Sequence, residues 1–311
     1  MYRVQVCVNS SLHSNFISSV FSIRAWAVAP EAGISPMFSR RRPLRLAAVE
    51  GGGTTFVVGI ADGTAANIVE RAEFPTTTPE ETLGRCAEWL AARDYDALGV
   101  ACFGPLDLRK ESRMYGHITT TPKPGWQFAD VLGPLCRVRP NVPVAWDTDV
   151  NAPALAEYRH AAAAALVAGQ PKPTSSAYVT VGTGIGVGLV VNCEPVHGLM
   201  HPEGGHVSVP RLASDSGFPG SNPKDTFNGN CIENLTCSHS LAKRAGLSDP
   251  SELRALPDDH PVWAAAAHYL GVLCANITLM VSPEKIVLSG GIMQRDSLWP
   301  NVRREAQAAL K

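Results

Sequence analysis

The sequence lacks an excess of charge of either sign. Its formal net charge is −1 at pH 7, from 27 basic and 28 acidic residues, so no broad positive field points to nucleic acid or an anionic membrane. We identify no apolar run that approaches the roughly 20 residues of a membrane-spanning helix. The eight cysteines are scattered through apolar segments, which suits a reducing compartment better than a disulfide scaffold. We therefore expect a soluble, cytoplasmic protein that binds neither nucleic acid nor a membrane.

Two glycine-rich stretches, residues 46–62 and 178–192, dominate the sequence. Each predicts an apolar strand, a Gly/Thr turn and a second apolar strand. Neither is a Walker A loop or a Rossmann fingerprint, because no Gly-Lys-Ser/Thr and no helix pattern follows the glycines. Glycines let a ligand approach the main chain, and successive N–H groups of a turn can bind an anion. Each stretch alone fits an ordinary hairpin equally well, but the pair predicts two similar domains that hold the phosphates of one nucleotide.

Residues 1–43 differ in composition from the rest of the chain. They are rich in Arg and Ser and hold a single acidic residue, Glu31. This composition is typical of an organelle transit peptide, and it also fits a disordered tail or a mispredicted start. We exclude the segment from the fold, and we expect an N-terminal α/β domain at residues 44–149 and a C-terminal α/β domain at residues 150–311.

Apolar periodicity predicts an alternation of strands and helices beyond the two hairpins. Further strands are expected at residues 68–74, 98–103, 142–146 and 284–289. Helices are expected at residues 80–93, 152–168, 231–245 and 262–281, and from residue 298 onward. The expected fold class is therefore α/β.

Candidate catalytic groups follow two of the predicted strands, at the strand ends where α/β sheets bind ligands. Asp147 and Asp149 follow the strand at 142–146, where a carboxylate can serve as the base in phosphoryl transfer. Capping of the next helix by Asp149 or Asn151 is the alternative, and the two roles are compatible. The preceding strand ends in a polar turn that starts at Gly104.

Two polar segments have a composition that suits a carbohydrate. Residues 115–126 offer three threonines, a lysine and a tryptophan in a Pro/Gly frame, and an irregular surface loop is the alternative. Glu203 and His206 lie on a glycine-rich turn, where a carboxylate and an imidazole can form hydrogen bonds to sugar hydroxyls or bind a metal ion. An ordinary surface turn is the alternative there.

Residues 44–311 resemble the ROK family of sugar kinases, and specifically its fructokinase branch. The resemblance rests on motifs that occur in the family's order, at residues 115–126, 146–151, 182–186, 201–206 and 288–293. It implies two ribonuclease-H-like (actin-like ATPase) domains with a nucleotide and sugar cleft between them. It also implies ATP-dependent phosphorylation of fructose to fructose 6-phosphate. The alternatives are a kinase for mannose or glucose, and a catalytically weak sugar-binding protein of the same family.

The same resemblance assigns roles to individual residues. Asp149 is implied as the general base that deprotonates the sugar hydroxyl. The implied sugar contacts are Thr120, Gly104, Asn151, Glu203, His206 and Glu233. The implied ATP contacts are Gly52, Gly53, Thr54, Thr55, Gly182, Thr183, Gly184, Gly290 and Gly291. Mg²⁺ is expected to accompany ATP because it offsets phosphate charge, and the family suggests a homodimer.

Three features depart from the family pattern. Thr55 occupies a position where these kinases usually have Lys or another polar residue, and the missing charge predicts weaker phosphate binding without loss of it. The family's structural zinc would use His206 and Cys231, but its other Cys and His ligands are missing, so a complete four-ligand zinc site is not expected. Members of the family usually extend past Lys311 by a strand and a helix, so we expect a C-terminal domain that is truncated.

Overall fold

The computed structural model describes residues 5–8, 42–220 and 229–311, which form two compact units. The N-terminal unit contains residues 42–167 together with the segment Val196–His201. The C-terminal unit contains residues 5–8, the segment Ala168–Pro195 and the described part of Pro202–Lys311.

The division between the units differs from the predicted boundary in one respect. The helix α4 (Asn151–Val167) belongs to the N-terminal unit, whereas the boundary predicted after residue 149 assigned it to the C-terminal domain. Residues 1–43 are expected to be a targeting segment, a disordered tail or a mispredicted start. Of these, residues 1–4 and 9–41 lie outside the described residues.

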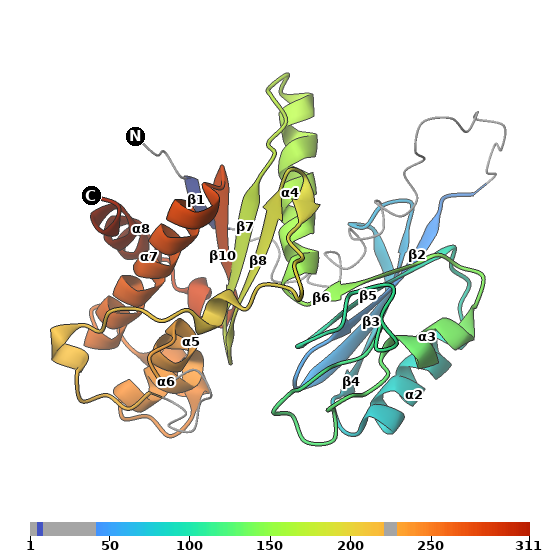
Figure 1. The fold of residues 1–311 in the computed structure, drawn as a ribbon, viewed down its shortest axis with the longest axis horizontal. Coiled ribbons are helices and arrows are strands. Elements are labelled where there is room, and N and C mark those ends of the chain that lie inside the picture. The colour runs from blue at the N-terminus through green and yellow to red at the C-terminus, as the bar shows by residue number, and fades with distance from the viewer. Residues whose placement is uncertain (1–4, 9–41, 221–228) are drawn as a thin grey trace. The chain divides into compact units, whose positions relative to one another are not determined.

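The N-terminal unit is built on a five-stranded sheet of order β4-β3-β2-β5-β6 (Figure 1). Its strands are β2 (Arg45–Gly51), β3 (Thr55–Asp62), β4 (Ile68–Pro75), β5 (Ala97–Cys102) and β6 (Val144–Thr148). β2 and β3 pair antiparallel as the predicted hairpin, β4 adds a third antiparallel strand, and β2, β5 and β6 run parallel. β5 is buried along its whole length, as befits a central parallel strand. All five strands match predicted ones.

Two helices, α2 (Pro79–Ala91) and α3 (Leu132–Val138), cover one face of this sheet (Figure 1). The start of α2 is capped, because the Thr78 hydroxyl accepts a hydrogen bond from the Glu81 amide at 3.3 Å. The buried side of α2, which includes Leu83, packs into the apolar core of the sheet. The core therefore fixes the sheet while leaving the loops at its ends available for a site.

The C-terminal unit contains a second five-stranded sheet, of order β1-β10-β7-β8-β9. Its strands are β1 (Gln5–Val8), β7 (Ser176–Val181), β8 (Ile185–Val191), β9 (Glu194–Pro195) and β10 (Lys285–Ser289). β7 and β8 form the second predicted hairpin, and β10 runs parallel to β7. β1 pairs parallel with β10 at the edge of the sheet. The exclusion of residues 1–43 from the fold is therefore wrong for residues 5–8, whose Val-rich composition favours a strand.

The two sheets share one strand order. In the N-terminal sheet an antiparallel set, β2, β3 and β4, is extended on the other side of β2 by the parallel strands β5 and β6. In the C-terminal sheet β7, β8 and β9 form the antiparallel set, and β10 and β1 are the parallel strands beyond β7. This repetition is what a pair of similar α/β domains requires.

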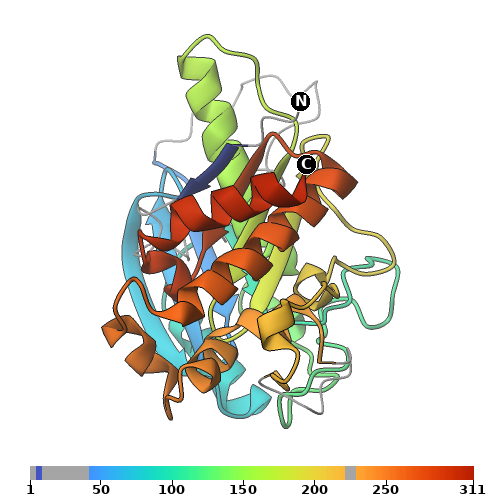
Figure 2. The same ribbon diagram turned by 90° about the vertical axis from the view of Figure 1, so that its left-hand side faces the viewer.

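The helices α7 (Pro261–Val281) and α8 (Leu298–Ala309) lie side by side in the C-terminal unit (Figure 2). α7 has 21 residues and is long and apolar enough, by length and composition alone, to cross a membrane. The expectation that no apolar run approaches this length is therefore wrong for α7. Twelve of its residues are buried, among them Trp263 and Leu270, so α7 is the core helix of its unit.

The helix predicted at residues 231–245 is broken into α5 (Ile232–Thr236) and α6 (Ser238–Arg244). Cys237 between them has an extended backbone, with φ −63° and ψ 167°. The amide of Ser238 then donates a hydrogen bond to the Gly182 carbonyl at 2.7 Å, which ties α6 to the turn between β7 and β8. Short 3₁₀ helices occur at η2 (Gly204–His206), η3 (Ala213–Asp215), η4 (Pro250–Ala255) and η5 (Gly291–Gln294).

Candidate active site

Three loops of the N-terminal unit meet at the carboxyl ends of its parallel strands. The strands β2, β5 and β6 run parallel, and Gly51, Cys102 and Thr148 lie side by side at their carboxyl ends. The segments that follow them therefore gather here, namely the hairpin tip, the loop that contains Gly104, and Asp149. The carboxyl edge of parallel strands is the usual ligand-binding edge of an α/β sheet.

The hairpin tip contains the predicted phosphate contacts Gly52, Gly53, Thr54 and Thr55. Its turn is closed by a hydrogen bond from the Gly52 amide to the Thr55 carbonyl at 3.0 Å. Gly51 has no room for a side chain, because a Cβ atom there would lie 2.6 Å from the Phe56 ring. A Cβ atom at Gly53 would meet nothing within 4 Å, so open space borders the tip. An open turn of this kind suits close approach by phosphate oxygens.

Asp149 is the first residue after β6, and its amide donates a hydrogen bond to the Cys102 carbonyl at 3.0 Å. The residue is half-buried, and desolvation raises its pKa from 3.8 to about 6. A carboxylate with this pKa is ionised at pH 7 and is more basic than an exposed Asp. These properties suit the general base that the sequence analysis predicts at this position.

Glu50 is a carboxylate at this edge that the sequence analysis misses. It precedes Gly51 on β2 and is half-buried. Burial, and after it the negative charge of Asp149, raise the pKa of Glu50 to about 8. The available signal in the sequence was an acidic residue directly before a glycine turn.

The donor set of Glu50 and Asp149 fits the expected Mg²⁺. This cation prefers oxygen ligands and is usually held by one or two carboxylates together with phosphate oxygens of a nucleotide. Two carboxylates at the same end of the sheet as an open phosphate-binding turn match that pattern. Within the described ranges, no group of three or more His, Cys, Asp and Glu side chains forms a metal site from protein ligands alone.

Asp147, Asn151 and His197 form a polar cluster next to Asp149 in the chain. Asn151 Nδ2 donates to Asp147 Oδ1 at 2.8 Å, and His197 Nε2 lies 3.1 Å from Asp147 Oδ2. His197 Nε2 also lies 3.1 Å from Asn151 Nδ2. Asn151 is fully buried, so its observed contacts are with the cluster, and its contact with a sugar stays a prediction. Sequence reasoning missed His197 because it lies on the distant segment Val196–His201.

The same segment supports the loop that contains Gly104. His201 is buried, and its Nε2 accepts a hydrogen bond from the Leu106 amide at 3.0 Å. A Cβ atom at Gly104 would lie 3.2 Å from the same nitrogen, so this glycine lets the ring approach the loop. His201 therefore orders a predicted sugar-binding loop, a role that the motif at 201–206 did not reveal from sequence.

The threonine segment 115–126 lies against that loop. Thr119 donates two hydrogen bonds to the Pro105 carbonyl, from its amide at 2.7 Å and from its hydroxyl at 3.1 Å. The next residue, Thr120, is exposed, as a sugar contact must be. The structure therefore brings the predicted sugar contacts Gly104 and Thr120 onto adjacent, hydrogen-bonded segments of one unit.

In the C-terminal unit, the two predicted ATP-binding turns lie at one edge of the sheet. The turn 182–184 follows β7, and the pair 290–291 follows β10, whose Ser289 pairs with Thr180. Gly290 has a φ of +94°, and a Cβ atom there would lie 2.4 Å from the Val181 carbonyl oxygen. Only glycine satisfies both conditions, which explains its presence in structural terms.

Glu233 supports the turn between β7 and β8. Its Oε2 accepts a hydrogen bond from the Ile185 amide at 2.8 Å, and a Cβ atom at Gly184 would lie 2.6 Å from that oxygen. Glu203 and His206 lie at η2, which contacts β8. The three predicted sugar contacts of this unit therefore lie near the start of β8, and Glu233 is also a hydrogen-bond acceptor for the predicted ATP-binding turn.

His206 and Cys231, the two expected remnants of a zinc site, lie in contact. Cys231 Sγ is 3.7 Å from His206 Nδ1, and it also accepts a hydrogen bond from the Asn234 amide at 3.4 Å. In the described part of the chain, no third His, Cys, Asp or Glu side chain joins them. The pair therefore offers two of the four ligands of a tetrahedral zinc site.

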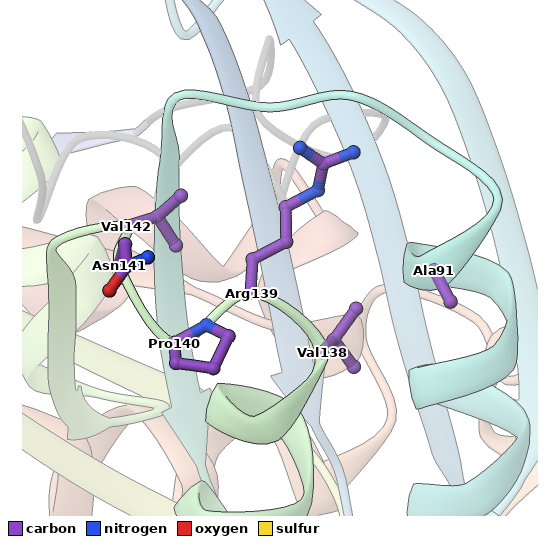
Figure 3. Close-up of a pocket in the computed structure, with 6 residues that line it drawn as sticks. All are labelled: Ala91, Val138, Arg139, Pro140, Asn141 and Val142. Carbon is purple, nitrogen blue, oxygen red and sulfur yellow. The ribbon is translucent and has the colours of Figure 1, made fainter.

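A pocket at the opposite edge of the N-terminal sheet contains none of the predicted site residues (Figure 3). It lies before the amino end of β6 and is lined by Ala91, Val138, Arg139, Pro140, Asn141 and Val142. Arg139 in this pocket is engaged by the Asp94 carboxylate and lies over the Tyr95 ring. The lining residues include no carboxylate, imidazole, thiol or hydroxyl group, so we assign the pocket no catalytic role.

Comparison with known proteins identifies the family. The sequence pattern of the ROK family matches residues 46–311, and the chain belongs to this family. It is 38% identical over 269 residues to a fructokinase of Zymomonas mobilis, which covers 83% of each chain. It is 35% identical over 267 residues to a fructokinase of Pediococcus pentosaceus, over 85% of this chain and 86% of that protein.

A solved structure agrees with the sequence comparison. A ROK hexokinase from Thermus thermophilus has a TM-score of 0.63 and 25% identity, over 85% of this chain and 90% of that one. The predicted family and the predicted fold class, an α/β fold of the actin-like ATPase type with two sheets, are both confirmed.

Proposed function

We propose that this protein is an ATP-dependent fructokinase, which transfers the terminal phosphate of ATP to the 6-hydroxyl of fructose. The observation that supports this most is its identity of 35–38% to fructokinases over more than four-fifths of the chain. The N-terminal unit supplies groups that the reaction needs: an open glycine turn and two carboxylates with raised pKa values at one sheet edge.

Phosphoryl transfer needs little covalent chemistry from the protein, so positioning and charge stabilisation dominate. Asp149, ionised at pH 7, accepts the proton of the attacking sugar hydroxyl. The Gly53 amide of the tip binds phosphate oxygens, whereas the Gly52 amide closes the turn with the Thr55 carbonyl. When bound, Mg²⁺ supplies positive charge that offsets the charge of the phosphates, and Glu50 is the residue that would hold it.

The remaining predicted residues keep supporting roles in this proposal. Gly104 and Thr120 contact the sugar, and so do Glu203, His206 and Glu233 of the C-terminal unit. The turn 182–184 and the pair 290–291 contact ATP. His201 holds the loop that contains Gly104 in place, and the cluster of Asp147, Asn151 and His197 ties the end of β6 to the segment Val196–His201. We further propose that the protein acts in the cytoplasm as a homodimer, following the family.

Fructose is the proposed substrate because both of the relatives described above are fructokinases. Mannose and glucose remain the alternatives for a kinase of this family. A catalytically weak sugar-binding protein is the alternative in a different class, since the zinc ligands are incomplete and Thr55 replaces the usual Lys.

Identification of the product tests the proposed reaction. Purified protein is incubated with Mg-ATP and ¹³C-labelled fructose, and the product is examined by ³¹P and ¹³C NMR. We expect phosphate on the oxygen of carbon 6, with one ADP formed per sugar phosphorylated. Phosphate on carbon 1 would contradict the proposed regiochemistry. Binding of fructose and ATP, seen as a higher melting temperature, without any product would identify a sugar-binding protein instead.

A further inference from the structure

The hairpin tip of the N-terminal unit has no cation of its own. Residues 51–55 are three glycines and two threonines, which can bind phosphate only through amides and hydroxyls. During phosphoryl transfer, charge spreads over the oxygens of the transferred group, and an enzyme stabilises it with fixed positive groups. Another part of the unit should therefore provide a positive side chain at the tip.

Lys123, from the threonine segment, reaches the tip. Its Nζ atom donates a hydrogen bond to the Gly53 carbonyl at 2.6 Å, across 70 positions of sequence. An ammonium group has three N–H donors, so two remain for other acceptors. Among the described residues Lys123 forms no ion pair, so no carboxylate neutralises it. Its side chain is half-buried and leaves the ammonium at the border of the open space beside Gly53.

A tight turn fixes the backbone that presents Lys123. The Trp126 amide donates a hydrogen bond to the Lys123 carbonyl at 3.2 Å, which closes the four-residue turn. Pro124 occupies the second position, and Gly125 occupies the third with a φ of +78°. These are the residues and the backbone conformation of a type II turn. Lys123 is therefore the first residue of a hydrogen-bonded turn rather than part of a flexible loop.

The turn and the hairpin tip rest on the same aromatic base. The Trp126 ring is fully buried and stacks on Phe56 with a centroid distance of 5.3 Å. Phe56 is the second residue of β3, so it directly follows the tip. The Trp126 Nε1 atom also donates to the Thr77 carbonyl at 2.8 Å. Because both segments are fixed to one packed cluster, the ammonium is held beside the tip before ATP binds.

Another cation of this region is already engaged. Arg71 on β4 forms an ion pair with Glu73, and its charge lowers the pKa of Glu50. It therefore acts on the carboxylates rather than on the tip. The contact of Lys123 differs in kind, because among the described residues its ammonium donates to a backbone carbonyl, which a phosphate oxygen can supplement or replace.

We propose that Lys123 is a catalytic residue that contacts the terminal phosphate of ATP and supplies the positive charge that the hairpin tip lacks. The inference rests on the proposed phosphotransfer function and assigns to the threonine segment a role in ATP binding in addition to sugar contact. It also explains how Thr55 is compatible with a working phosphate site.

The test compares Lys123→Met with Lys110→Met, which removes the same charge from an exposed lysine of the same unit. Two quantities are measured: kcat/KM for Mg-ATP, and the Kd values of a non-hydrolysable ATP analogue and of AMP. We expect Lys123→Met to lower kcat/KM for ATP by about 10- to 100-fold. This range corresponds to the usual free energy of a hydrogen bond to a charged group. Binding of the ATP analogue should weaken, while AMP, which has no terminal phosphate, should bind within about twofold of wild type.

The outcomes separate this proposal from the function itself. Lys123→Arg keeps the charge and should retain more activity than Lys123→Met, and Lys110→Met should match wild type. Unchanged kcat/KM for ATP in Lys123→Met would overturn the proposal, and so would equal losses of binding for AMP and the ATP analogue. If wild type shows no turnover with any sugar, the proposed function fails, while the comparison of ATP-analogue and AMP binding still decides the role of Lys123.

Discussion

Replacing Asp149 with Asn lowers kcat by about 10²- to 10⁴-fold and raises the thermal stability of the protein at pH 7.5. The first effect follows from loss of the group that accepts the proton of the sugar hydroxyl. The second follows from burial, which raises the pKa of Asp149 to about 6. An isosteric amide has the same shape but carries no charge, so it removes a desolvated carboxylate from the folded state.

The sign of the stability effect follows from linkage. The folded protein binds the proton of Asp149 more tightly than the unfolded chain, in which the pKa is near 3.8. This group therefore favours folding below pH 3.8, and that contribution is lost as the pH rises through about 6. At pH 7.5 the ionised side chain costs stability, which the amide avoids.

Thermal unfolding and steady-state kinetics of Asp149→Asn check both effects on one sample. Asp259→Asn, which alters an exposed Asp of the C-terminal unit, is the matched control and should leave both quantities unchanged. If Asp149→Asn retains wild-type turnover, Asp149 is not the base. If turnover is lost together with stability, the residue is structural rather than catalytic.

Lowering the pH from 7 to 4.5 should reduce kcat/KM for fructose by about 30-fold, because Asp149 is progressively protonated. With a pKa of about 6, the base is mostly ionised at pH 7 and loses about tenfold of its active form for each pH unit below 6. Rates are measured at saturating Mg-ATP between pH 4.5 and 8, with far-UV circular dichroism at each pH to confirm that the protein is folded. The residual activity of Asp149→Asn should lack this inflection.

Two other outcomes of the pH series would count against this assignment. A profile that is flat down to pH 5 would mean that no group with a pKa near 6 must be ionised. An inflection near pH 4 would indicate an ordinary exposed carboxylate. Protonation of Asp149 does not itself unfold the protein, because its raised pKa favours the folded state at low pH.

The sequence predicts local features of the site well, because each depends on a short stretch of chain. The hairpin tips and the position of Asp149 after a strand follow from composition and periodicity alone. The two hairpins also indicate the repeated α/β fold, since each lies in one of two sheets with the same strand order.

Features that depend on contacts between distant segments could not be predicted. Lys123 reaches Gly53 only because Trp126 packs on Phe56, and His201 reaches Leu106 only because the chain returns to the N-terminal unit. The raised pKa of Glu50 likewise arises from its burial and, after that, from the negative charge of Asp149, and both follow from the alignment of β2, β5 and β6.

Backbone breaks and edge pairings were also beyond sequence reasoning. The helical periodicity at residues 231–245 continues through Cys237, but the Ser238 amide gains a hydrogen bond to the Gly182 carbonyl when the helix breaks there. Residues 5–8 have a composition that favours a strand, but so short a strand depends on pairing with the edge of β10. In both cases a partner from elsewhere in the chain decides the local conformation.

The measurement that tests the proposed fructokinase activity most directly is ADP release by purified protein with Mg-ATP and fructose, glucose, mannose or no sugar. We predict that kcat/KM is highest with fructose and that ADP release without sugar stays at background. A higher kcat/KM for glucose or mannose would contradict the proposed substrate. ADP release that no sugar accelerates, from protein that is folded, would contradict the proposed kinase activity.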